Sequence, residues 1–206
     1  MCEGRIQLNR PPFCRKCSRP LSFPQSQCRT CRKKAIRFDY AWGVCLYNNS
    51  MRRLIHLLKY GNRTLLRHFF MKKMLSFFNS YRVNLDPADL IIPIPLHPAR
   101  FRERGFNQAQ ILACLIAQKF NKPLATKHLL RKRHTRHQAV LTKKERWTNI
   151  EGAFTIKHSS SLKGKHILLV DDLLTTGATA SEAAKMLKSA GAAKVGLLAL
   201  AVAPAE

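Results

Sequence analysis

The chain has 206 residues, 46% of them hydrophobic, which is enough for one full-sized domain with a buried core and a small additional module. Lysine and arginine number 37 against 11 aspartates and glutamates, giving a formal net charge of +26. This excess predicts a polyanionic partner such as a nucleic acid, with a charge that serves only solubility as the alternative. No stretch reaches the roughly 18 apolar residues of a membrane helix, so membrane insertion is not expected.

The N-terminus indicates the compartment. Residues 1–13 are polar and proline-rich, and they lack the apolar run of a signal peptide. We therefore expect a cytoplasmic protein, in which cysteines serve as metal ligands or free thiols more readily than as disulfides.

Residues 1–35 are predicted to form a separate metal-binding module, because they are too polar to build a core unaided. Cys14 and Cys17 form one C-x-x-C pair, and Cys28 and Cys31 form a second. Four thiolates would complete a closed tetrahedral site for a structural Zn²⁺, while two disulfides or a redox pair are the alternatives. The basic residues around the pairs are candidates for contact with a nucleic-acid backbone: Arg15, Lys16, Arg19, Arg29, Arg32, Lys33 and Lys34.

Residues 36–206 alternate between strand-like and helix-like patterns. Strands are predicted over 36–47, at "DLIIPIP" ending at Pro95, over 125–130, and at "HILLV" and "KVGLLALAV". Helices are predicted over 51–60, 65–78 and 106–120 and at "TASEAAKMLKSAG", which Gly191 closes. This alternation predicts an α/β domain with a mainly parallel sheet flanked by helices.

Two adjacent acids follow the apolar run "ILLV". Asp171 and Asp172 stand at its carboxyl end, where open α/β sheets bind ligands. The next residues, "LLTTGAT", lead into a helix predicted to begin near Thr179, so amide groups and threonine hydroxyls could bind a phosphate there. Because carboxylates repel phosphate, hydroxyls or a cation must lie between the two acids and the phosphate. A ribose 5-phosphate group carries both the hydroxyls and the phosphate. A helix cap beside a solvated acidic turn is the alternative.

The segment "ILLVDDLLTTGAT" resembles the motif with which type I phosphoribosyltransferases bind phosphoribosyl pyrophosphate (PRPP). The resemblance implies that Asp171 and Asp172 bind the ribose hydroxyls at the catalytic centre, with Mg²⁺ accompanying PRPP. It also implies that the following loop holds the 5-phosphate through Thr175, Thr176, Gly177, Ala178 and Thr179. The Walker pattern and G-x-G-x-x-G are absent, which weighs against an ATPase motor and a dinucleotide-dependent oxidoreductase.

Further segments resemble one particular family that contains this motif. Together with the four cysteines, "LIHLLKYGN", "IIPIPLHPARFRERGFNQAQILA" and "LLRKRHTRHQAVLTKKERWTNIEGAF" resemble the ComF family of competence-associated proteins. Lys59, Tyr60 and Gly61 resemble a pyrophosphate-contacting loop. Arg104 begins the family's R-G-F-N-Q signature, which follows the strand ending at Pro95, so Arg104 is a candidate for binding the phosphate groups of PRPP. For Arg104 and Phe106, a solvated charge and a core residue are the alternative interpretation.

Family membership implies a phosphoribosyltransferase-like fold behind a zinc finger. It also implies handling of internalised single-stranded DNA during natural transformation, with a helicase or recombination mediator as partner. An active phosphoribosyltransferase acting on a small acceptor is the alternative, although no acceptor site is evident in the sequence. A PRPP-sensing transcription regulator ranks last, because no base-reading motif stands out.

The segment around 131–149 is predicted to be a long basic loop, of the kind that closes over substrate in phosphoribosyltransferases. Arginines and lysines there could contact DNA phosphates, with Trp147 stacking on a base. The candidates are Arg131, Lys132, Arg133, Arg136, Lys143, Lys144, Arg146 and Trp147. His134 and His137 are interpreted as solvated polar groups.

Overall fold

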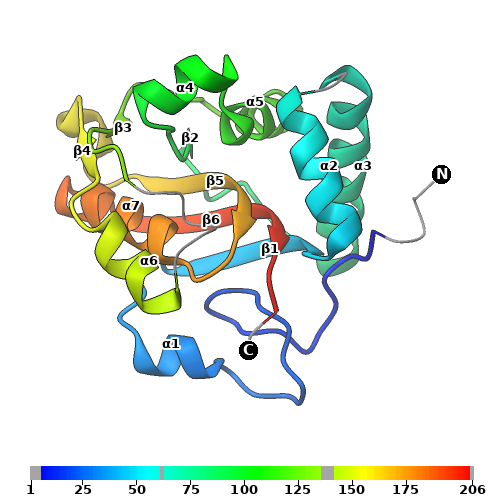
Figure 1. The fold of residues 1–206 in the computed structure, drawn as a ribbon. Helices are drawn as coiled ribbons and strands as arrows, with labels where there is room; N and C mark the ends of the chain where they lie inside the picture. Colours follow the sequence, from blue (N-terminus) through cyan, green and yellow to red (C-terminus); the bar gives the residue numbers. More distant parts are fainter. Residues whose placement is uncertain (1–5, 61–62, 136–141, 205–206) are drawn as a thin grey trace.

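The computed structural model describes residues 6–60, 63–135 and 142–204. A four-stranded sheet in the order β1-β6-β5-β2, with all neighbouring strands parallel, forms the centre of the fold (Figure 1). Its strands are β1 (Tyr40–Leu46), β2 (Leu90–Pro93), β5 (His166–Leu174) and β6 (Lys194–Val202). This sheet confirms the predicted α/β class.

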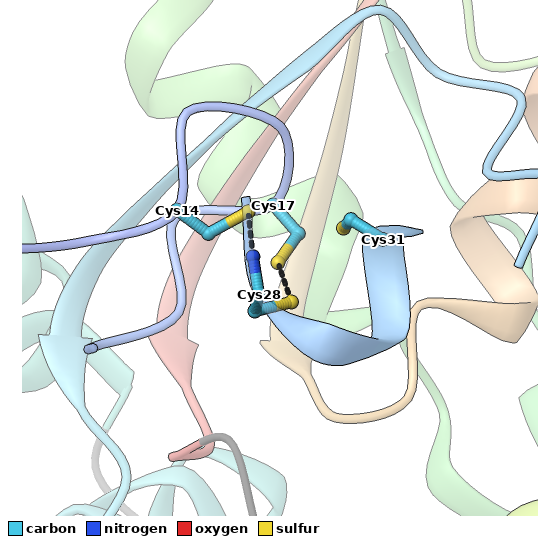
Figure 2. Close-up of side chains that lie close together, drawn as sticks. All are labelled: Cys14, Cys17, Cys28 and Cys31. Carbon is cyan, nitrogen blue, oxygen red and sulfur yellow. Dashed lines mark hydrogen bonds between the residues drawn. The ribbon is translucent and has the colours of Figure 1, made fainter. Parts of the chain in front are cut away.

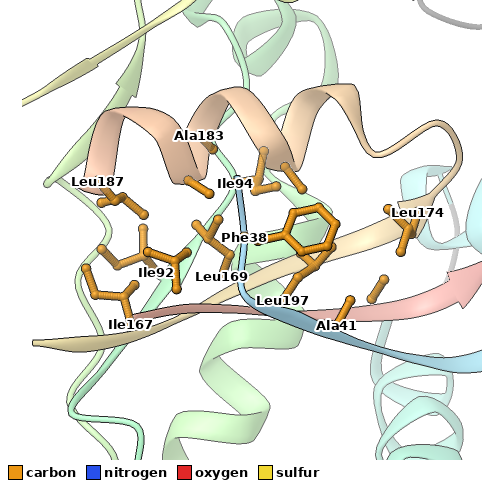
Figure 3. Close-up of a cluster of buried hydrophobic side chains, with 14 of the residues drawn as sticks. Phe38, Ala41, Ile92, Ile94, Ile167, Leu169, Leu174, Ala183, Leu187 and Leu197 are labelled. Carbon is orange, nitrogen blue, oxygen red and sulfur yellow. The ribbon is translucent and has the colours of Figure 1, made fainter. Parts of the chain in front are cut away.

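Helices cover both faces of the sheet (Figure 1). The helices α2 (Asn49–Tyr60), α3 (Arg63–Tyr81) and α5 (Gln108–Lys119) lie over one face, and α7 (Ala178–Ser189) lies over the other. Successive residues of β5 point to opposite faces, so Leu168 packs with the first group and Leu169 packs beneath α7 (Figure 3). The run "ILLV" is therefore apolar throughout because both of its faces are buried.

Two parts of the fold differ from the prediction. The strand expected over 125–130 is β3 (Leu129–Arg131), which pairs antiparallel with β4 (Phe154–Ile156) in a separate two-stranded sheet. The basic segment is not loop throughout, since α6 (Lys143–Ile150) occupies its second half. A capping box explains this helix: the Thr142 hydroxyl accepts from the Glu145 amide, and the Glu145 carboxylate accepts from the Thr142 amide.

Among the described residues, three short helices complete the fold: α1 (Arg29–Lys33), α4 (Pro98–Arg104) and the 3-10 helix η3 (Ser159–Leu162). Among the described helices, none is both long and apolar enough to cross a membrane. Cys14, Cys17 and Cys28 are buried in the same apolar cluster as Leu174 and Ala178, so the N-terminal module packs onto the sheet domain. A domain boundary near residue 35 stays a prediction.

Because position 196 is a glycine, the pairing of β1 with β6 depends on the absence of a side chain there. Gly196 lies directly opposite Tyr40, and a Cβ at position 196 would meet the Tyr40 ring at 2.3 Å. Gly196→Ala is therefore expected to lower the free energy of unfolding by about 1–3 kcal/mol. Chemical denaturation measures this loss, which should shrink in a Tyr40→Ala background; an equal loss in both backgrounds would contradict the steric explanation.

Candidate functional site

The two acids lie inside β5 and not beyond its end. Pairing with β2 stops at Pro93 and Val170, whereas pairing with β6 continues to Leu174, so the β2 side of the strand is unpaired from Asp171 onward. Both residues are half-buried, and Asp171 Oδ1 accepts a hydrogen bond from the Asp172 amide at 2.9 Å. The acids therefore lie on an unpaired edge of β5 near the carboxyl end of the sheet, the end at which open α/β sheets bind ligands.

The pKa of Asp171 is raised well above its usual range, first by burial and then by the neighbouring Asp172 carboxylate. The Arg131 guanidinium acts in the opposite direction and lowers this pKa. A carboxyl group in such surroundings is stabilised by a bound cation or by hydroxyl donors, which are the groups offered by Mg²⁺ and by ribose.

A short loop joins the acids to α7. Gly177 has φ +81 and is the residue before the first turn of α7, a conformation that favours glycine. It supplies no side chain to cap the helix, and the Thr176 hydroxyl accepts from the Ala178 amide at 3.3 Å. Thr176 is buried and Thr175 is half-buried. The loop thus combines threonine hydroxyls with the start of a 12-residue helix, an arrangement that suits a phosphate.

Two buried arginines lie close together, and one of them, Arg131, interacts with Asp171. Arg100 in α4 and Arg131 in β3 are each 7% exposed, and their Nη2 atoms donate to the carbonyl and the hydroxyl of Thr135, respectively. Within the described ranges, the Nε of each guanidinium has no hydrogen-bond partner and neither arginine forms an ion pair. Burial and the neighbouring Arg100 lower the pKa of Arg131 to about 10. Like charges buried together are costly unless an anion joins them, so this pair can receive an oxyanion.

The four predicted metal ligands come together in one cluster (Figure 2). Their sulfur atoms all lie within 4.8 Å of one another, near the roughly 3.8 Å edge of a tetrahedron with 2.3 Å metal–sulfur bonds. None of the four is in a disulfide. Contact with the Cys17 thiol lowers the pKa of Cys14 to about 6, and the same contact raises the pKa of Cys17. Crowded thiols that compete for protons fit a thiolate-binding metal ion.

Comparisons with known proteins show the family of the chain. A family model described as "Phosphoribosyl transferase domain" matches residues 107–206. Competence protein ComFC of Bacillus subtilis is 31% identical, over 93% of this chain and 78% of that protein. The chain belongs to the ComF family.

Other relatives cover this ComF-family chain almost completely. Competence protein F of Haemophilus influenzae is 29% identical over 98% of this chain and 90% of that protein. DNA utilization protein YhgH of Escherichia coli K12 is 29% identical over 95% of this chain and 92% of that protein. Among solved structures, glutamine PRPP amidotransferase from B. subtilis is similar with a TM-score of 0.43 and 18% identity, over 65% of this chain and 26% of that chain.

The R-G-F-N-Q segment at residues 104–108 has local structural roles. Gly105 has φ +73 and ends α4, and Phe106 is buried. The Asn107 side chain caps α5 by accepting from the Ala109 amide, and it also donates to the Ile94 carbonyl. Arg104 is half-buried at the last position of α4. Arg100, four residues earlier, was not predicted, although its position after the carboxyl end of β2 could have indicated it.

The predicted pyrophosphate loop is only partly described. Lys59 and Tyr60 end α2, but their side chains and all of Gly61 lie outside the described residues.

The predicted DNA-binding residues of the basic segment occupy different environments. Lys132, Arg133 and Lys144 are exposed, whereas Arg131 is buried beside the acids. Trp147 is half-buried against the core with Lys34 5.8 Å from its ring centroid, so its ring is less available for base stacking than expected. Arg146 is half-buried, the Lys143 side chain is not described, and Arg136 lies outside the described residues.

Proposed function

We propose that this ComF-family protein handles internalised single-stranded DNA in natural transformation and binds PRPP or a related phosphoribosyl ligand. The ligand proposal rests on one observation: two acids, a short loop and the start of a helix follow one another at the carboxyl end of β5. The relatives named as competence and DNA utilization proteins support the DNA role. Cytoplasmic location, and a helicase or recombination mediator as partner, belong to the same proposal.

The proposed ligand position follows from the charges around the acids. Hydroxyls of the ribose would meet Asp171 and Asp172 together with Mg²⁺, and the 5-phosphate would meet residues 175–179. Arg100 and Arg131 offer a second anion site near Asp171. A ligand with negative groups at both ends of a ribose, such as PRPP, matches this order of charges.

A structural Zn²⁺ in the cysteine cluster is part of the proposal. When bound, it would supply cross-linking and no catalysis, because four thiolates leave no position for substrate. The four sulfurs already converge, and the surrounding module is polar, so the metal would stabilise its fold.

The proposed path of DNA is a basic surface over α1 and α6, which lie near each other (Figure 1). It is defined by exposed residues of these two helices and the turn after α1: Arg29, Arg32, Lys33, Lys34 and Lys144. These side chains carry charge without carboxylate partners among the described residues. Such a surface attracts a phosphate backbone without reading its sequence.

Single-stranded DNA is expected to bind with a steep salt dependence that comes largely from this surface. Replacing Arg32, Lys33 and Lys144 by Ala should reduce the slope of log affinity against log salt by about 0.7 for each phosphate that the protein no longer neutralises. Fluorescence anisotropy with a labelled oligonucleotide measures the slope. The matched control replaces three exposed basic residues on the α2 and α5 side, Arg52, Arg53 and Lys119. Absence of salt-sensitive binding in the parent protein would contradict the DNA role.

A further inference from the structure

One arginine of the cysteine module is not on the surface. Arg19 follows the first cysteine pair by two positions and is 5% exposed. Its Nη2 donates to the carbonyl oxygen of Thr175, 156 positions further along the chain, in the loop between the acids and α7. Its Nε has no hydrogen-bond partner among the described residues. A buried guanidinium aimed at a backbone carbonyl is a positioning contact and not a surface for DNA.

The hydrogen bond to Thr175 sets the direction of the next amide. In a trans peptide the C=O and the N–H point in opposite directions, because the six atoms lie in one plane. When Arg19 holds the Thr175 carbonyl, it therefore also orients the Thr176 N–H away from the cysteine module. Phosphate loops work through such oriented amides, so the orientation of this one peptide bears on anion binding.

The cysteine knuckle fixes Arg19 in turn. The Cys14 amide donates to the Arg19 carbonyl at 2.8 Å, and the Ser18 amide donates to the Cys14 carbonyl at 2.8 Å. Asn9 joins this turn to β1, since its Nδ2 lies 2.6 Å from the Ser18 carbonyl and 3.1 Å from the Gly43 carbonyl. Arg19 is thus held by the backbone that also places two candidate metal ligands.

From these contacts we propose that Arg19 is a positioning residue that couples the cysteine module to the phosphate loop. Loading of the module with metal then orders the Thr175–Thr176 peptide, and binding of a phosphorylated sugar depends on the metal without contact between them. The inference rests on the proposed phosphoribosyl site and adds to it a dependence on the module. It also explains why a zinc-type knuckle and a ligand loop share one apolar cluster.

The test compares Arg19→Met with Arg15→Met, which removes an exposed charge from the same knuckle. By isothermal titration calorimetry, Arg19→Met is expected to bind ribose 5-phosphate about 10-fold more weakly, the effect of removing a charged hydrogen bond, and Arg15→Met within about 2-fold of the parent. Arg19→Lys, which keeps one donor, should recover part of the affinity. Metal content should stay at the parent level in all three variants.

Metal removal completes the test. Chelation should weaken ribose 5-phosphate binding by the parent protein about as much as Arg19→Met does, and it should weaken the Arg19→Met variant little further, because both changes remove the same coupling. Parent affinity retained after chelation, or equal losses from chelation in both proteins, would overturn the inference.

Hydrogen exchange separates this inference from the proposed function. Exchange of the amides in residues 175–178, followed by mass spectrometry without ligand, should become about 10-fold faster in Arg19→Met and stay unchanged in Arg15→Met. A parent protein that fails to bind ribose 5-phosphate but shows this pattern would refute the phosphoribosyl site and keep the coupling. Unchanged exchange in Arg19→Met would refute the coupling.

Discussion

Replacing Asp171 and Asp172 together by Asn is expected to weaken Mg²⁺-dependent binding of PRPP by at least about 10-fold, the lower range for removing charged hydrogen bonds at one site. The reason is that Asn keeps the shape of each side chain but removes its negative charge, which would attract Mg²⁺. Asn also replaces one carboxylate oxygen, which would accept a hydrogen bond from a ribose hydroxyl, by an NH₂ donor. Isothermal titration calorimetry with PRPP and Mg²⁺ measures the loss. The matched control is Asp86→Asn, an exposed acid that precedes β2.

The pH dependence of binding gives a second measurement on Asp171. Its pKa is raised in the folded protein, so the proton is lost only as pH rises through that elevated pKa. Affinity for PRPP with Mg²⁺ should therefore increase over this pH range. Stability without ligand should change in the opposite direction, falling as pH rises from the unfolded pKa through the folded one. Asp171→Asn should remove both dependences, and a parent protein with flat binding would contradict the assigned role.

The biological consequence can be tested in the host. The doubly substituted strain should lose transformation while uptake of DNA into the cell continues, because the proposed site serves a step after entry. Scoring the two processes separately distinguishes this outcome from a defect in uptake. Transformation at the parent level would mean that the phosphoribosyl site does not serve DNA handling.

The central sheet could be predicted because its information is local. The apolar run before Asp171 requires burial on both faces, and the change from strand to helix is visible at Gly177. Pairing is not local, and so the strand was predicted to end before the acids, whereas continued pairing with β6 extends β5 to Leu174. The α6 helix was missed for a different reason: its capping box, formed by Thr142 and Glu145, is a local signal, but it stands within a run of charges that was interpreted as a loop.

The arginines show the limit of sequence reasoning about the site. Arg131 and Lys132 are adjacent in one basic run, yet one is buried beside Asp171 and the other is exposed. Arg19 is indistinguishable in sequence from the exposed Arg15. A charge run predicts average exposure, and only tertiary packing decides which member of the run turns inward.

The buried pair of Arg100 and Arg131 gives the second large expected effect. Arg131→Met is expected to weaken binding of inorganic pyrophosphate by at least about 10-fold, because the variant cannot form a charge-assisted hydrogen bond to an oxyanion in a desolvated place. The control is Lys132→Met, an exposed neighbour. A comparable loss should follow from Arg100→Met and not from the exposed Arg102→Met on the same helix.

Stability distinguishes a binding role for the arginine pair from a structural one. The pair consists of two like charges that are desolvated and form no ion pair among the described residues, and the attraction between Arg131 and Asp171 offsets only part of this cost. Arg131→Met removes one of these charges; it also removes the guanidinium that lies 5.7 Å from the Phe154 ring centroid, a contact that a Met sulfur partly replaces. The midpoint of thermal unfolding should therefore stay level or rise without ligand, while the increase caused by pyrophosphate in the parent protein disappears. A large fall in the midpoint together with retained pyrophosphate binding would instead identify Arg131 as a structural residue of the β3–β4 sheet.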